Sequence, residues 1–320
     1  MVGVFGMRSC FGFICVMVLL AGCARAQNPD LTSSPSATSQ SSTPVSRPVE
    51  LIPDASGAVP PEQIRALLRK AETNDLENNK RLRDYTYIER VEQHKLDGHG
   101  QIKKVESTTS EILQIYGEQV ERWIEKDDKP LPEPKAKKEE EKIQKIIDKR
   151  KNESEDDRRK RLEKEEKARE EDRKFVLEVA DAFNFRLVGS DIVDGFDTWV
   201  LDAEPRAGYE PKQRASKLLT KFKGRLWIDK REAQLVKLDI MAIDTISFGF
   251  IVARIHKGTH VLLEQTKIND EVWLPKHVAV HVDARIALFK NIDEDIDVTY
   301  RDYRKFRTDT KITVVGESRE

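Results

Sequence analysis

The chain has 320 residues, enough for one large domain or two modest ones. Charged residues make up 35% of it, but 56 basic and 57 acidic side chains leave a formal net charge of -1. A balance this close to neutral gives no overall argument for nucleic-acid binding. The three cysteines, Cys10, Cys15 and Cys23, all lie near the N-terminus, so the body of the protein has neither a disulfide framework nor a thiolate metal site.

Residues 1–23 have the features of a bacterial export signal. Arg8 precedes an apolar run that is shorter than the roughly 20 residues a membrane span needs. Residues 20–23 read LAGC, which resembles the lipobox of bacterial lipoproteins and implies lipidation of Cys23. A competing cleavage site, Ala-Arg-Ala before Gln27, would give a secreted form. We therefore expect a periplasm-facing envelope protein anchored to a membrane by a lipid on Cys23, with the secreted form as the alternative.

Residues 24–60 are rich in Ser, Thr and Pro and poor in aromatic residues. Such a segment buries too little apolar surface to offset its ordering entropy, so it is predicted to be a disordered tether. The prolines at 60 and 61 suit the start of a helix. Ile64, Leu67, Leu68 and Ala71 follow at helical spacing and predict an amphipathic helix over residues 62–82.

The remaining elements outside the region 131–174 are predicted to be mostly strands. Residues 84–117 indicate a hairpin that turns at 97–100, and residues 185–206 indicate a second that turns at Asp194-Gly195. Residues 224–306 alternate between polar and apolar side chains, and between 277 and 288 Val278, Val280 and Val282 share one face while His277 and His281 share the other. This period of two predicts an antiparallel sheet with one buried face.

Residues 131–174 are dominated by charges of both signs. Acidic residues precede basic ones by four positions repeatedly, an arrangement that supports a helix by about 0.2–0.5 kcal/mol per pair. The main interpretation is a solvated helical arm inserted between strands. The alternative is a partner-docking helix, which depends on Ile143, Ile146 and Ile147. A nucleic-acid arm is disfavoured because acidic residues balance the basic ones.

Three phrases carry a resemblance to a known family. They are GRLWIDKREAQLVKLDI (224–240), INDEVWLPKHVAV (268–280) and VTYRDYRKF (298–306). Together they resemble the pattern of the LolA/LolB-like superfamily of bacterial outer-membrane lipoprotein-sorting proteins. The resemblance implies an α+β fold, a half-open antiparallel β-barrel whose apolar cavity is lidded by helices and receives acyl chains. The barrel would comprise 61–130 and 175–310, with the insertion at 131–174 and a tail at 311–320.

Two polar groupings are candidates for metal sites. His277 and His281 share a strand face, but their Cα atoms would lie about 13 Å apart, too far for a shared metal. Asp293, Glu294, Asp295 and Asp297 form an acidic cluster, but they are interspersed with apolar residues and lack the loop and glycine of a calcium site. We expect neither metal nor cofactor. No catalytic motif such as G-x-S-x-G or H-E-x-x-H is present, so an enzyme, for example a periplasmic hydrolase, has no residues to support it.

Large aromatic side chains are the candidates for ligand binding. Phe248 and Phe250 flank a glycine and, with Trp227 and Phe289, would line an apolar pocket, although the same residues suit a packed sheet. The leading hypothesis is a non-enzymatic envelope protein that binds a lipid or acyl chain, in lipoprotein or lipid trafficking. The alternative is a membrane-anchored interaction module with a filled barrel and a docking helix for an envelope protein. Neither involves nucleic acid.

Overall fold

The structure is a computed structural model. It describes residues 50–305 apart from 117, 214, 249–252 and 287–289. The export signal, Cys23, most of the predicted tether and the tail therefore lie outside the described residues.

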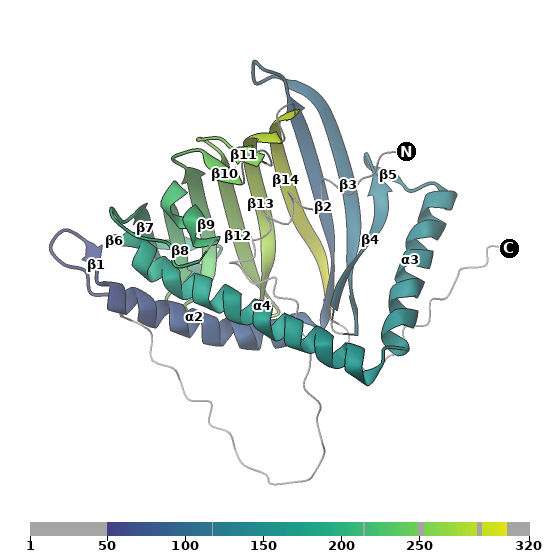
Figure 1. Ribbon diagram of the computed structural model, residues 1–320, viewed down its shortest axis with the longest axis horizontal. Coiled ribbons are helices and arrows are strands. Elements are labelled where there is room, and N and C mark those ends of the chain that lie inside the picture. Colours follow the sequence, from purple (N-terminus) through teal and green to yellow (C-terminus); the bar gives the residue numbers. More distant parts are fainter. Residues whose placement is uncertain (1–49, 117, 214, 249–252, 287–289, 306–320) are drawn as a thin grey trace, which may run out of the picture.

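The strands form one antiparallel sheet in the order β1-β6-β7-β8-β9-β12-β13-β14-β2-β3-β4-β5. Two short strands, β10 and β11, pair with each other, and β11 also pairs with β13. Since β1 and β5 stand at opposite ends of this order, the sheet is open, as predicted for a half-open barrel (Figure 1). The strands are β1 (Ala58–Val59), β2 (Tyr85–Leu96), β3 (Ile102–Ile115), β4 (Glu118–Lys126), β5 (Lys129–Pro130), β6 (Phe183–Val193), β7 (Phe196–Pro205), β8 (Phe222–Asp229), β9 (Leu235–Ala242), β10 (Ile246–Phe248), β11 (Ala253–Ile255), β12 (His260–Ile268), β13 (Val272–Ile286) and β14 (Lys290–Lys305).

The two faces of the sheet differ in the way the sequence predicts. On β13, Val278, Val280 and Val282 are at most 5% exposed, whereas His277 and His281 on the other side are only partly buried. We call the face that bears these valines the inner face and the face that bears the two histidines the outer face. Alternation along paired strands then assigns every neighbouring residue to one face or the other.

In the described part of the chain, three α-helices and one 3-10 helix accompany the sheet: α2 (Pro61–Leu82), α3 (Glu133–Lys151), α4 (Glu155–Ala182) and η2 (Ala215–Lys221). Helix α2 begins at Pro61 as predicted, and it buries Ile64 and Leu67. Figure 1 shows α2 and α4 lying across one end of the strands. Apolar residues of both helices pack with β6, β7 and β8 in one cluster, which we call the helix cluster.

The charged insertion consists of two helices. It breaks at 152–154, where the Oγ of Ser154 accepts a hydrogen bond from the backbone N of Asp157 at 3.2 Å and so begins α4. Helix α4 then crosses the predicted boundary at 174 without interruption and places Phe175 and Ala180 in the helix cluster. The second half of α4 is therefore part of the main domain.

Helix α3 packs on the chain's own sheet. The partner-docking alternative instead expected its isoleucines to be available to another protein. Ile143 is 8% exposed and contacts Ile115 and Val120 in a small apolar cluster that Ile146 and Ile147 join. Val298 is the register partner of Val91, and Val91 of Thr108, so even-numbered positions from 108 to 112 face inward. Ile115 therefore lies on the outer face, and the apolar stripe of α3 is already occupied there.

The tether predicted over 24–60 ends before residue 51. Leu51 and Val59 are 4% and 5% exposed and belong to the helix cluster. Strand β1 pairs with β6, and the backbone N of Ile52 donates to the Oε1 of Gln63 at 2.8 Å. Composition did not predict the pairing of β1 with β6. Leu51 and Val59 are isolated apolar residues in a polar segment, and only their contacts with distant parts of the chain order them.

Candidate ligand-binding face

The inner face carries a continuous apolar surface, which we call the apolar wall. Its buried members are at most 8% exposed, and in the described part of the chain all of them come from strands. Helices α2 and α4 contribute instead to the helix cluster, which meets the apolar wall through Leu226 and Leu235. The members of the apolar wall are Leu238, Val261, Leu263, Val278, Val280, Val282, Ala284, Ile296 and Val298.

Helix α2 approaches the sheet in two different ways. Its first half packs Ile64 and Leu67 into the helix cluster. Its second half is held by hydrogen bonds to backbone groups at the ends of strands. The amide of Asn78 donates to the carbonyl of Trp273 at 2.9 Å and accepts from its N–H at 2.6 Å, while the Nη1 of Arg81 donates to the carbonyl of Glu271 at 2.7 Å.

A carboxyl group lies under the second half of α2. Burial raises the pKa of Asp75 to about 6, and a hydrogen bond from Gln234 only partly opposes this shift. The Nε2 of Gln234 also donates to the Oε1 of Gln265 at 3.0 Å. Polar side chains therefore lie between the middle of the helix and the sheet, whereas Leu82 at its end packs with Val272 and Leu274.

A polar and aromatic patch borders the apolar wall. Four residues on β14, β2, β3 and β4 are register partners in one row: Tyr300, Glu89, Ser110 and Trp123. In the next row, Glu121 accepts hydrogen bonds from the Oγ of Ser110 at 2.8 Å and the Nε1 of Trp123 at 2.7 Å. Burial raises the pKa of Glu89 to about 7, the charge of Glu121 adds to the increase, and a hydrogen bond with Tyr300 opposes it.

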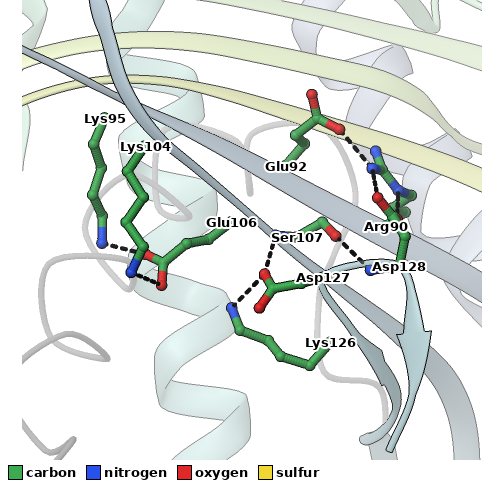
Figure 2. A network of polar contacts seen from close by, with 9 residues as sticks. All are labelled: Arg90, Glu92, Lys95, Lys104, Glu106, Ser107, Lys126, Asp127 and Asp128. Atoms are coloured by element: carbon green, nitrogen blue, oxygen red, sulfur yellow. Dashed lines mark hydrogen bonds and ion pairs between the residues drawn. The ribbon is translucent and has the colours of Figure 1, made fainter.

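Farther along β2 and β3, charged side chains are paired with opposite charges (Figure 2). The carboxylate of Glu106 forms ion pairs with Lys95 and with Lys104, whose Nζ lies at 2.8 Å. The hydrogen bonds from the two lysines lower the pKa of Glu106 to about 2. On the outer face, the Nε of Arg90 donates to the Oδ1 of Asp128 at 2.9 Å. These pairs contrast with Glu89 and Glu121, whose hydrogen-bond donors are neutral.

The structure places Trp227 on the outer face. The neighbouring residues Leu226 and Ile228 point to the helix cluster, while the Nε1 of Trp227 donates to the Oδ2 of Asp191 at 3.2 Å. The Nζ of Lys237 lies 5.2 Å from the centre of its ring. Trp227 is therefore on the opposite side of the sheet from the apolar wall.

Of the other predicted ligand residues, Phe248 ends β10, and Phe250 and Phe289 lie outside the described residues. Glu89 and Glu121 were missed in the sequence. A signal for Glu89 was present, because it follows Tyr85 and Tyr87 at inward-facing positions of an alternating strand, where a carboxyl group is unexpected.

The histidines of the outer face are paired with aspartates. The Nε2 of His277 lies 2.6 Å from Asp297, and the Nδ1 of His281 lies 2.8 Å from Asp295. Over the residues that the structure describes, no group of three or more His, Cys, Asp or Glu side chains is placed to hold a metal ion. Within the same ranges, no helix has both the length and the apolar character to cross a membrane.

Comparisons with known proteins give likeness at the level of structure. No protein-family model matches the chain, and no curated protein does. Similar solved structures include a DUF1329 family protein from Desulfovibrio piger, 13% identical, with 77% of this chain and 93% of that chain covered and a TM-score of 0.28. A putative outer membrane lipoprotein-sorting protein domain from Vibrio parahaemolyticus is 11% identical over 78% of this chain and 95% of that chain, with a TM-score of 0.32.

A LolA superfamily protein from Nitrosomonas europaea is 10% identical over 76% of this chain and 93% of that chain, with a TM-score of 0.27. Two of these proteins are described as lipoprotein-sorting or LolA superfamily proteins, the superfamily that the sequence resembles.

Proposed function

We propose that this chain is a non-enzymatic envelope protein that holds a lipid or another apolar chain against the inner face of its sheet. The observation that supports this proposal most is the apolar wall, which is built from strands alone in the described part of the chain while α2 and α4 pack in a separate cluster. An acyl chain laid on such a surface would gain about 0.8 kcal/mol for each CH₂ group that leaves water. The ligand would pass to or from a partner protein in lipoprotein or lipid trafficking.

A second candidate is an interaction module whose sheet is filled by its own side chains. It is favoured by the low exposure of the apolar wall, whose buried members are 1–8% exposed. The two candidates differ in whether the inner face can accept extra volume. A filled core resists added side-chain atoms, whereas a ligand site loses its ligand to them.

Replacing Val280 with Trp tests this difference, with His281→Trp as the matched control on the outer face. In a binding protein, Val280→Trp should leave the melting temperature nearly unchanged and abolish uptake of a fluorescent fatty-acid probe. In a filled sheet, the same substitution should destabilise the fold by about 1–3 kcal/mol through overpacking. His281→Trp should alter neither property.

Native mass spectrometry of the purified protein gives an independent test. Co-purified lipid would support the proposal. If no lipid is carried, the wild-type protein binds no probe and Val280→Trp lowers the melting temperature, the filled module replaces the binding protein.

We also propose that a lipid on Cys23 anchors the protein in the envelope, supported by the LAGC sequence. Intact-mass analysis of the membrane fraction should then show a diacylglyceryl group on a mature chain that begins at Cys23. A mature chain that begins at Gln27 would instead establish the secreted form.

A further inference from the structure

The patch beside the apolar wall combines two carboxyl groups with aromatic side chains on one sheet face. Glu89 lies between Tyr300 and Ser110 in cross-strand register, and Trp123 continues the row on β4. The next row holds Tyr87, Ile112 and Glu121, also as register partners. Both carboxyl groups therefore come from inner-face positions, on the two strands that flank β3, and the charge of Glu121 acts on Glu89 across Ser110 of that strand.

Neither carboxyl group has a cation. Glu121 accepts from Ser110 and Trp123, and Glu89 is hydrogen-bonded with Tyr300. Within the described ranges, no lysine or arginine forms an ion pair with Glu89 or Glu121, although two lysines converge on Glu106 on the same face. Both side chains are half-buried, and a carboxylate that is partly withdrawn from water is stabilised by a positive partner, which the described part of the chain does not supply here.

The aromatic side chains favour the same kind of partner. The rings of Tyr87 and Tyr300 pack edge to face, with their centres 6.0 Å apart. Trp123 is 39% exposed, although its Nε1 is bound to Glu121. An exposed indole face beside a carboxylate attracts ammonium groups through the ring quadrupole as well as through charge. Aromatic rings and carboxyl groups thus point independently to a cation.

The apolar wall adjoins this patch directly. Val298 lies two residues from Tyr300 on β14, and Val91 lies two residues from Glu89 on β2, so each pair shares the inner face. A chain lying along the wall would place its end group at the two glutamates. We propose that Glu89 and Glu121, flanked by Tyr300 and Trp123, form a subsite for the protonated amine of an amphiphilic ligand. This inference rests on the proposed function and specifies its ligand class, a cationic amphiphile.

Three probes with the same chain and different end groups test the subsite: dodecylammonium, dodecanol and dodecanoate. Each is titrated calorimetrically at pH 7, the two ionic probes below their micelle concentrations and dodecanol below its solubility limit. We expect dodecylammonium to bind about tenfold more tightly than dodecanol, because charge-assisted hydrogen bonds are about twice as strong as neutral ones. Dodecanoate should bind most weakly. The double variant Glu89→Gln, Glu121→Gln should reduce the affinity for dodecylammonium to that for dodecanol and leave dodecanol unchanged.

Glu92→Gln is the matched control, since Glu92 lies on the same strand but on the outer face, where Arg90 and His94 bind it. It should change none of the three affinities. If the double variant does not fold, Trp123→Leu provides the second test and should weaken dodecylammonium selectively. Equal affinity for all three probes would overturn the subsite while leaving the proposed function intact. Absence of binding by every probe would overturn both.

Discussion

Glu178 shows how one buried carboxylate organises a loop. It is 4% exposed on α4 and accepts hydrogen bonds from the N of Lys212 at 2.7 Å, the Oγ of Ser216 at 2.5 Å and the side chains of Tyr209 and Gln213. Burial raises the pKa of Glu178, but these hydrogen bonds outweigh it and leave the pKa below its ordinary value. The carboxylate is thus bound by donors from the segment between β7 and β8.

Replacing Glu178 with Ala should therefore lower the free energy of unfolding by about 3 kcal/mol, because several buried donors lose their acceptor together. Urea denaturation measures this loss. Glu170→Ala, an exposed position on the same helix, should cost less than about 0.5 kcal/mol. A loss for Glu178→Ala as small as that of the control would show that water replaces the carboxylate.

Glu89 gives a prediction about pH. Its pKa is raised from 4.5 to about 7, so the folded chain binds this proton more tightly than the unfolded chain does. The contribution of the protonated group to stability is complete below pH 4.5 and is lost as the pH rises through about 7. Relative to the wild type, Glu89→Gln should be more stable at pH 8 than at pH 5, as measured by urea denaturation at both values.

Glu92→Gln should behave in the opposite way. Hydrogen bonds from His94 and Arg90 lower the pKa of Glu92, so its carboxylate stabilises the folded chain at neutral pH and loses that effect in acid. This variant should lose stability relative to the wild type at pH 8 and lose less as the pH falls toward the lowered pKa. Two variants with the same sign of pH dependence would contradict the assignment of these residues to different environments.

At the scale of elements, α3 has one apolar attachment to the sheet. Ile143 fills the contact with Ile115 and Val120, and the Nη2 of Arg150 binds both oxygens of Glu118 at 2.5 and 2.7 Å. Ile143→Asp should detach α3 and make residues 133–151 sensitive to limited proteolysis, because a carboxylate cannot be buried there without a partner. The melting temperature of the main sheet should change little.

Lys145→Asp is the control, since it changes the charge of an exposed position on the same helix. Its proteolysis pattern should match that of the wild type. If Ile143→Asp instead removes the cooperative transition of the whole domain, α3 is a structural part of the core.

The sequence predicts elements better than it predicts their neighbours. Alternation correctly divided β13 into its two faces, because that period is local. The end of α3 also had a local signal in Asn152 and Ser154, two residues that favour helix ends. The outward position of Trp227 had one too, because alternation along β8 places it on the side of Arg225 and opposite Leu226. The surface on which α3 docks had none, because that docking depends on contacts between segments far apart in the chain, which no short window of sequence contains.

For the whole molecule, the decisive feature is that the sheet stays open. Its two edge strands are only two residues long, and β1 pairs with just the start of β6. Short edge strands limit pairing with other chains. The segment that precedes α2 also has a structural role, because it forms β1, the strand at one edge of the sheet.

This role predicts a difference between two truncated forms of the protein. A chain that begins at Glu50 keeps Leu51, Val59 and the hydrogen bonds between Ile52 and Gln63, whereas a chain that begins at Pro61 loses all of them. Burying a Leu or Val side chain contributes about 1.5–3 kcal/mol each, and the entropy of ordering some ten residues offsets part of this. We expect the shorter form to lose about 2 kcal/mol of unfolding free energy.

Urea denaturation of the two forms measures the difference, and Leu51→Ala in the longer form locates it. That single substitution should account for a large share of the loss if burial in the helix cluster is the cause. Equal stability of both forms would mean that residues 50–60 contribute nothing to the free energy of unfolding, and that the folded domain begins at Pro61. A loss in the shorter form without an effect of Leu51→Ala would assign the stabilisation to the pairing of β1 with β6.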